Sequence, residues 1–250
     1  MNLKKIISHI TRYDKIVERL HNLSEKDDII ISQQQEILMA HKYHDTIADY
    51  EWLKYKGISP GGWAVDYAFC YTLARTLNAM HPQNILECGL GQSSRIIHQY
   101  AAFHGSCAAV TCEHDEVWID FLKKETGDKY PINIQKVELK EVEYNGVKTL
   151  TYTDIPKIFH NKSYDLILID GPFGSEHYSR SQAIGLCKDN LKEPFCIIVD
   201  DTERLGEIET VEEIKKVLSL KSIDFAETTY SSIKSHTLLC SKELAFLTSL

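Results

Sequence analysis

Two glycines spaced two residues apart lie in the segment ECGLGQSS. Gly89 and Gly91 allow a tight turn and let a ligand approach the backbone, because glycine carries no Cβ. Ser93 and Ser94 can cap the helix expected after the turn and can donate hydroxyl hydrogen bonds. Glu87 is expected to lie beside the bound ligand, where its carboxylate can receive an ammonium group.

Acidic residues follow three more apolar runs of the sequence. Glu113 ends the run VTCE, and Asp170 follows the run YDLILI. Asp200 and Asp201 follow the run FCIIV. Because the carboxyl ends of parallel strands meet at one edge of a sheet, where ligands bind, we expect these acids near the glycine turn. Glu113 can accept hydrogen bonds from both hydroxyls of a ribose, and the adjacent His114 can stack on an adenine.

The acids at the ends of the fourth and fifth strands also suit catalysis. Asp170, Asp200 and Asp201 offer oxygen ligands only, which suits Mg²⁺. A magnesium ion would hold two substrate hydroxyls and lower the pKa of the one that reacts. In the alternative, Asp200 caps a loop, Asp201 binds substrate and no metal enters. Either Asp170 or His177 can act as the base for a hydroxyl proton, unless His177 is only a surface residue.

Further residues are candidates for binding the acceptor substrate. Tyr178 and Arg180 follow the fourth predicted strand, and Arg204 follows the fifth. Arg180 can bind an acidic group of the substrate or pair with an acid on a helix. Trp63 follows the break SPGG that precedes the core. We expect Trp63 to line the acceptor pocket from a lid, with packing in the core as the alternative.

Apolar runs and helical patterns alternate from residue 84 onward, which is typical of strand-helix-strand units and a parallel sheet. YDLILI and FCIIV are nearly continuous apolar runs, as expected for strands buried on both faces. We therefore expect residues 59–250 to form an α/β domain with a Rossmann-like, mostly parallel seven-stranded sheet and helices on both faces. Strands are predicted at 84–88, 108–112, 132–142, 164–169, 195–199, 225–230 and 236–240, the last two antiparallel, and 147–152 can pair with part of 132–142. Helices are predicted at 63–80, 93–104, 116–125, 155–160, 178–190 and 211–218.

Residues 1–58 differ from the rest of the chain. The first fifty contain no glycine or proline, and their apolar residues recur at helical spacing. This pattern predicts a helical arm of two helices, broken near residues 24–28. The arm either packs on the core or forms a homodimer with a second copy.

Charge and cysteine content narrow the class of protein. The chain carries 28 Lys and Arg against 36 Asp and Glu, for a net charge of −8, and no basic cluster, which argues against a nucleic-acid partner. Its seven cysteines form no C-x-x-C pair, so we expect a reducing cytoplasm without disulfides or a zinc site. No run reaches the ~18–20 apolar residues that span a bilayer. A small molecule is the expected partner.

The segments ILECGLGQSS, VTCEHD and YDLILIDGP together resemble the class I S-adenosylmethionine (SAM) dependent methyltransferases over residues 84–240. The form E-x-G-L-G-x-S-S is similar to a bacterial group associated with polysaccharide gene clusters and to plant glucuronoxylan methyltransferases. The resemblance implies that Glu87, Gly89 and Gly91 hold the methionine part of SAM and that Glu113 holds its ribose. It implies transfer of a methyl group to a hydroxyl of a sugar or nucleotide-linked sugar in capsular or other surface polysaccharide biosynthesis. The acids after strands four and five also resemble those of metal-dependent O-methyltransferases acting on catechols and macrolide sugars.

Three other functions remain open from the sequence. An aminopropyltransferase shares the expected fold and would need acids along a polyamine channel. An NAD-dependent oxidoreductase is disfavoured, because Ser94 stands where a dinucleotide-binding fingerprint has its third glycine. A non-catalytic SAM-binding scaffold that dimerises through residues 1–50 is the third.

Overall fold

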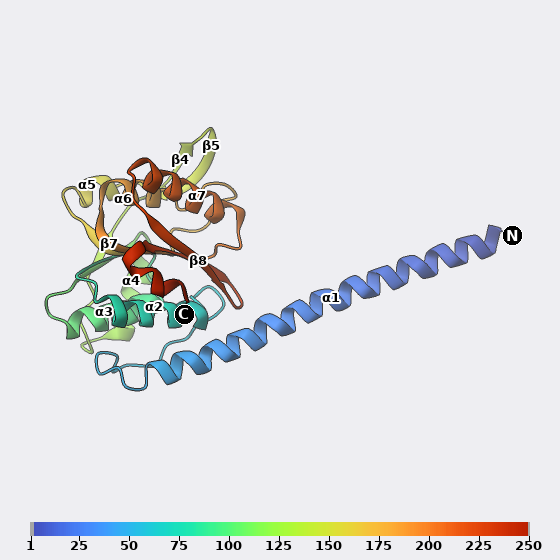
Figure 1. The fold of residues 1–250 in the computed structure, drawn as a ribbon, viewed down its shortest axis with the longest axis horizontal. Coiled ribbons are helices and arrows are strands. Elements are labelled where there is room, and N and C mark those ends of the chain that lie inside the picture. Colours follow the sequence, from blue (N-terminus) through green and yellow to red (C-terminus); the bar gives the residue numbers. More distant parts are fainter. Residues whose placement is uncertain (1–2, 250) are drawn as a thin grey trace.

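The computed structural model describes the backbone of residues 3–249 and the side chains of residue 13 and residues 15–249. One long helix leads into a body in which helices lie on both sides of a central sheet (Figure 1). Within the described part of the chain, no helix is both long enough and apolar enough to cross a membrane.

The central sheet has seven strands in the order β3-β2-β1-β6-β7-β9-β8. Its pairs are parallel except for β9, which runs antiparallel to both β7 and β8. This topology confirms the predicted Rossmann-like, mostly parallel seven-stranded sheet. The strands are β1 (Asn84–Cys88), β2 (Ala108–Glu113), β3 (Ile134–Lys136), β6 (Tyr164–Ile169), β7 (Leu191–Val199), β8 (Phe225–Ser231) and β9 (Ser235–Ser241), with β4 (Leu139–Tyr144) and β5 (Val147–Tyr152) in a separate hairpin.

The centre of the sheet brings three strand ends together. Every residue of β6 is buried, as its largely apolar sequence predicts, and its one acid, Asp165, accepts from the amides of Gln83 and Asn84. Cys88 of β1 pairs with Ile169 of β6, which pairs with Val199 of β7. The amide of Asp170 donates to the carbonyl of Cys88 at 2.8 Å, and the amide of Asp200 donates to the carbonyl of Ile169 at 3.0 Å. The loops that follow β1, β6 and β7 therefore begin at the same height along the strand axis.

Helices cover both faces of the sheet, as predicted (Figure 1). On one face the apolar residues of α2 and α3 join a buried cluster with β1, β6 and β7. On the other face α5, α6 and α7 join a second cluster. The helices are α1 (Leu3–Thr46), α2 (Tyr67–Met80), α3 (Gln92–Phe103), α4 (Glu116–Thr126), α5 (Ile155–Ile158), α6 (Gln182–Asp189) and α7 (Leu205–Leu220), followed by a 3-10 helix (Lys242–Ser249) that the sequence reading missed.

The N-terminal arm is one helix of 44 residues, so the predicted break near residues 24–28 is wrong. The segment SEKDD there contains no helix breaker, and His21 and Glu25 form an i,i+4 pair at 3.2 Å. Among the side chains of the arm that the structure describes, those of its last third join it to the body. Tyr43 is fully buried, and the Glu36 carboxylate accepts from the amide of Tyr67 at 2.9 Å and from the Ser232 hydroxyl at 2.7 Å.

Three other elements begin or divide at residues that differ from the prediction, for local structural reasons. α2 begins at Tyr67 rather than at residue 63, because the Asp66 carboxylate caps it by accepting from the amide of Phe69 at 2.8 Å. The predicted strand 132–142 is two strands, of which only β3 joins the main sheet. α6 begins at Gln182 rather than at residue 178, after residues whose backbone is left-handed.

Candidate active site

The loops after β1 and β6 touch through two glycines. A Cβ on Gly89 would lie 2.8 Å from the amide nitrogen of Gly171, and a Cβ on Gly171 would lie 2.6 Å from the Cα of Gly89. Gly89 also has φ +99°, which few other residues adopt. Gly91 differs from both. It has extended backbone at φ −164°, and a Cβ there would meet nothing within 4 Å. The first turn is therefore closed on the side of Gly89 and open at Gly91, where a ligand can reach the backbone at the start of α3.

Glu87 lies beneath this turn and is fully buried. Its carboxylate accepts from Ser93 Oγ at 2.5 Å, from Ser94 Oγ at 2.6 Å and from Thr111 Oγ1 at 2.6 Å. Ser94 also accepts from the amide of Gly91 at 2.9 Å. The structure thus places Glu87, Ser93 and Ser94 in one network that supports the turn from below. Burial raises the pKa of Glu87 to about 7, although the three hydroxyls oppose that rise.

Glu113 braces the same turn from the end of β2. One of its carboxylate oxygens accepts from the amide of Leu90 at 3.0 Å, and the other accepts from the amides of His114 and Asp115 at 2.6 and 2.9 Å. His114 Nδ1 lies 2.7 Å from the second oxygen. Trp118 donates to the carbonyl of Leu90 at 2.6 Å. Glu113 and His114 are therefore adjacent to the glycine turn, as expected, and Trp118 anchors the turn to α4.

Asp170, Asp200 and Asp201 gather where β6 and β7 end, with ligand oxygens within 4.8 Å of one another. Both oxygens of Asp200 are buried, and among the described residues neither has a hydrogen-bond partner. Burial raises the pKa of Asp200 well above its usual range, and the neighbouring Asp170 and Asp201 add to the rise. Burial also raises the pKa of Asp170 to about 6, against the pull of Arg180. This acidic cluster has donor atoms of the kind and spacing that a cation needs.

Arg180 is the main buried cation beside the cluster. Its guanidinium lies 2.6 Å from Asp201 and 3.6 Å from Asp170, and it donates to the carbonyls of Pro172 and Asp200 at 3.2 and 3.0 Å. Its side chain is only 4% exposed. The expected pairing with a helix acid is present in the 3.8 Å contact between Arg180 and Glu207 of α7, but the shorter contacts of Arg180 are to acids at strand ends.

Lys234 is a second cation at the cluster and was missed in the sequence. It lies in the turn between β8 and β9, with Nζ 3.3 Å from Asp201 and 3.9 Å from Asp200. Arg204 reaches Asp201 from the start of α7 at 3.0 Å and is half exposed. With burial opposing them, Arg180, Lys234 and Arg204 hold the pKa of Asp201 below its usual range.

His177 and Tyr178 point to neighbouring elements. His177 Nδ1 lies 3.0 Å from Glu209 of α7, and its side chain is 37% exposed. Tyr178 packs its ring 5.1 Å from that of Tyr144 in the β4–β5 hairpin. Both residues therefore contact α7 and the hairpin rather than the acidic cluster.

Trp63 is 92% exposed, so it does not pack in the core of this structure. It lies on the loop before α2, where the amide of Ser59 donates to the Gln92 side chain at 3.2 Å. Gln92 is the first residue of α3 and follows Gly91 directly. The loop that carries Trp63 is thus tied to the open end of the glycine turn.

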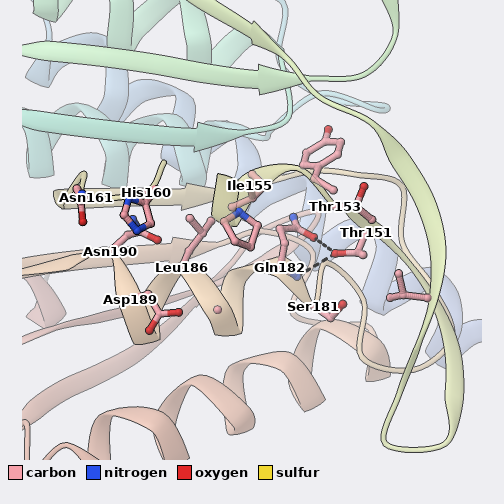
Figure 2. A pocket seen from close by; sticks show the side chains of 14 residues that line it. Thr151, Thr153, Ile155, His160, Asn161, Ser181, Gln182, Leu186, Asp189 and Asn190 are labelled. Atoms are coloured by element: carbon pink, nitrogen blue, oxygen red, sulfur yellow. Dashed lines mark hydrogen bonds between the residues drawn. The ribbon is translucent and has the colours of Figure 1, made fainter. Parts of the chain in front are cut away.

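A separate pocket of about 630 Å³ lies between α5, α6 and the β4–β5 hairpin (Figure 2). It is lined by mixed polar and apolar side chains. Gln182 reaches from α6 to Thr151 of β5, whose Oγ1 donates to the Gln182 side-chain oxygen at 2.7 Å (Figure 2). The Gln182 side-chain amide also donates to the carbonyl of Gly171 at 2.7 Å. Gln182 therefore stands between this pocket and the loop that carries Asp170.

Comparison with known proteins gives likenesses of structure at low identity. No protein-family model and no curated sequence matches the chain. A candidate caffeoyl-CoA O-methyltransferase from Staphylococcus aureus matches with TM-score 0.48 and 14% identity, over 85% of this chain and 99% of that one. An O-methyltransferase from Bacillus cereus, solved with S-adenosylhomocysteine (SAH), matches with TM-score 0.45 and 15% identity, over 82% and 90%. At these identities and TM-scores, the activity of those proteins cannot be assigned to this chain.

The buried Glu87 predicts an unusual dependence of stability on pH. Because its folded pKa of about 7 lies above the ordinary 4.5, the folded state keeps a proton that the unfolded state has lost. The resulting stability is full below about pH 4.5 and is lost as the pH rises through 7, by about 3 kcal/mol in all. Glu87→Gln, which has no carboxylate to ionise, is expected to lose less stability than wild type between pH 5 and pH 7.5, as measured by urea unfolding. Glu125→Gln, at an exposed position, is the matched control, and equal losses in Glu87→Gln and wild type would contradict the assignment.

Proposed function

We propose that the chain is a SAM-dependent O-methyltransferase. The observation that carries this proposal is the meeting of two features at one edge of the sheet. The glycine turn is open at Gly91, and the loop that contacts it at Gly89 leads back to Asp170 and the acidic cluster. A nucleotide-like methyl donor and an acceptor hydroxyl would then lie side by side.

The donor would lie along the first two strand ends. The backbone at Gly91 would face the methionine part, where a Cβ finds open space. Glu113 would take the ribose hydroxyls and His114 would pack against the adenine, both next to the turn. We assign Glu87 to positioning Ser93 and Ser94, since its carboxylate is buried beneath them and faces their hydroxyls. Because both serine side chains are fully buried and donate to Glu87, Ser93 and Ser94 would meet the donor through their backbone at the start of α3.

The acceptor hydroxyl must lose a proton. SAM supplies a methyl group on a sulfonium sulfur, so as the O–C bond forms, the S–C bond breaks and SAH leaves. Asp170 is the better placed base, because it ends β6 beside the glycine turn and its pKa of about 6 suits proton transfer near neutral pH. His177, held by Glu209, is the second candidate.

The acidic cluster fits Mg²⁺. Asp170, Asp200 and Asp201 supply only oxygen atoms, and the Asp200 oxygens, which have no hydrogen-bond partner among the described residues, are the kind of buried acceptors that a cation satisfies. When bound, the ion would polarise an acceptor hydroxyl. Without an ion, Arg180 and Lys234 are the cations that balance these acids.

For the acceptor we propose a sugar or nucleotide-linked sugar of capsular or other surface polysaccharide. Support comes from the resemblance of the E-x-G-L-G-x-S-S turn to enzymes of that kind and from Trp63, whose exposed indole offers a flat surface for the C–H face of a sugar. Tyr178 and Arg204 remain candidates for further contacts, and Arg180 would act by orienting Asp170 and Asp201. We place the reaction in the cytoplasm, in keeping with seven free cysteines, six of them buried.

Substitution of Gly91 tests the binding of the donor. Gly91→Ala is expected to fold, because the position has room for a methyl group and an ordinary backbone conformation. The added methyl group would occupy the space of the ligand and weaken SAH binding at least tenfold, which is about 1.4 kcal/mol. Gly185→Ala, equally open but on α6, is the control. Equal SAH affinity of Gly91→Ala and wild type in calorimetric titration would contradict the placement of the donor at Gly91.

Two substitutions separate the candidate bases. With an acceptor found by screening nucleotide-linked sugars for methyl uptake, Asp170→Asn should lower kcat about 100-fold or more. His177→Gln should cost less than tenfold, since that side chain is partly exposed and held by α7. The reverse order of effects would assign the proton transfer to His177.

Removal of divalent ions tests the cluster independently of the donor. Mg²⁺ titrated into wild type should release or absorb heat and raise the unfolding temperature, and Asp200→Asn should abolish both effects. Dialysis against EDTA should remove activity, and Mg²⁺ should restore it. Activity that survives EDTA unchanged would show that Arg180 and Lys234 suffice.

A further inference from the structure

The first two thirds of α1 lie outside the body of the protein (Figure 1). Residues 15–31 are all exposed, and the contacts with the body begin near Glu36. Large apolar side chains between residues 13 and 38 of α1 are 46–67% exposed: Tyr13, Ile16, Val17, Leu20, Leu23, Ile29, Ile30, Ile31, Ile37 and Leu38. Exposed apolar side chains along a helix indicate a surface that another molecule covers.

These apolar residues fall mainly on one side of the helix. Tyr13, Val17 and Leu20 follow one another at spacings of four and three residues, and Ile31 and Leu38 continue the same heptad positions. The side chain nine residues beyond Leu20, that of Ile29, lies two and a half turns away and so on the opposite side. The stripe is what an elongated apolar partner, such as another helix, would cover.

The charges on α1 separate along its length. Residues 3–21 hold five Lys or Arg and two Asp or Glu, whereas residues 22–46 hold two Lys or Arg and five Asp or Glu. Two such helices attract when they run antiparallel, because the basic half of each lies over the acidic half of the other. A parallel pair would place like charges together.

We propose that α1 pairs antiparallel with the α1 of a second copy, centred on Leu20. The free part of the helix runs from residue 3 to about residue 37, and its midpoint is residue 20. The sign of the charge changes just after the same point, between Arg19 and Glu25. Full overlap of the two free parts gives a contact about 50 Å long at 1.5 Å per residue. The two bodies then sit at opposite ends of the paired helices.

The pairing requires no methyl transfer, so it stands or falls separately from the proposed function. In a pairing centred on Leu20, the numbers of two facing residues add up to about 40. Tyr13 of one copy thus faces Asp27 of the other, and Leu20 faces Leu20 of the second copy. In a parallel pair every stripe residue would face its own copy.

Light scattering on the purified full chain tests the association. Wild type should have the mass of a dimer, and Leu20→Asp should be a monomer with an unchanged unfolding temperature for the body. Ile29→Asp makes the same chemical change on the opposite side and should remain dimeric. A wild-type monomer, a larger assembly, or loss of the dimer in both variants alike would overturn the proposal.

Disulfide crosslinking tests the direction. Leu20→Cys should crosslink to itself under oxidation, and Leu38→Cys should not, whereas a mixture of Tyr13→Cys and Asp27→Cys chains should form the mixed product. Wild type is the background, since only Cys107 among its cysteines is partly exposed. Self-crosslinking of Leu38→Cys would show a parallel pair. Binding of monomeric wild type to vesicles of anionic lipid, in place of dimerisation, would assign the helix to a membrane surface instead.

Discussion

The contact between Gly89 and Gly171 sets how closely the loops that follow β1 and β6 approach each other. Two backbones approach so closely there that a single Cβ on either residue would overlap the other chain segment. This approach depends on the level alignment of β1 and β6, in which the amide of Asp170 bonds the carbonyl of Cys88. The glycine turn proposed for the donor and the loop that leads to the acidic cluster meet at this contact.

Buried acids lie near this contact, and they fall into two groups that differ in how their carboxylate oxygens are satisfied. Glu87 and Glu113 are satisfied by hydroxyls and backbone amides, so they fix the shape of the glycine turn. Asp170, Asp200 and Asp201 are satisfied only in part, by Arg180 and Lys234. Arg180 and Asp201 also adopt left-handed backbone, at φ 59° and 61°, which is costly for residues with a Cβ and is found at functional sites. Glu87 and Glu113 are thus fixed by protein hydrogen bonds, whereas Asp200 keeps buried oxygens that no hydrogen bond of the described residues satisfies.

Much of the sheet and of its edge could be predicted from the sequence, because strand ends are local. Asp170 and Glu113 follow apolar runs directly, and the sheet topology gathers those ends. Lys234 could not be found that way. It lies in an unremarked turn and reaches the cluster only because β9 pairs with β7. The complete burial of Glu87 could not be predicted either, because a residue two positions before a glycine can face either side of the turn.

The contacts of Arg180 and Trp63 show the same limit of local reasoning. An arginine near a strand end reads equally well as a substrate ligand or as a partner of acids, and only the packed structure places its guanidinium between two strand ends. Trp63 follows a glycine-rich break, which does not say whether the indole turns inward. In the structure it is almost wholly exposed.

The identity of the donor is the claim on which the proposed chemistry depends. Calorimetric titration of the purified wild-type chain with SAH and, separately, with NAD tests it directly. One SAH should bind per chain, and NAD should give no binding heat. Binding of NAD without binding of SAH would contradict the assignment of this edge to methyl transfer.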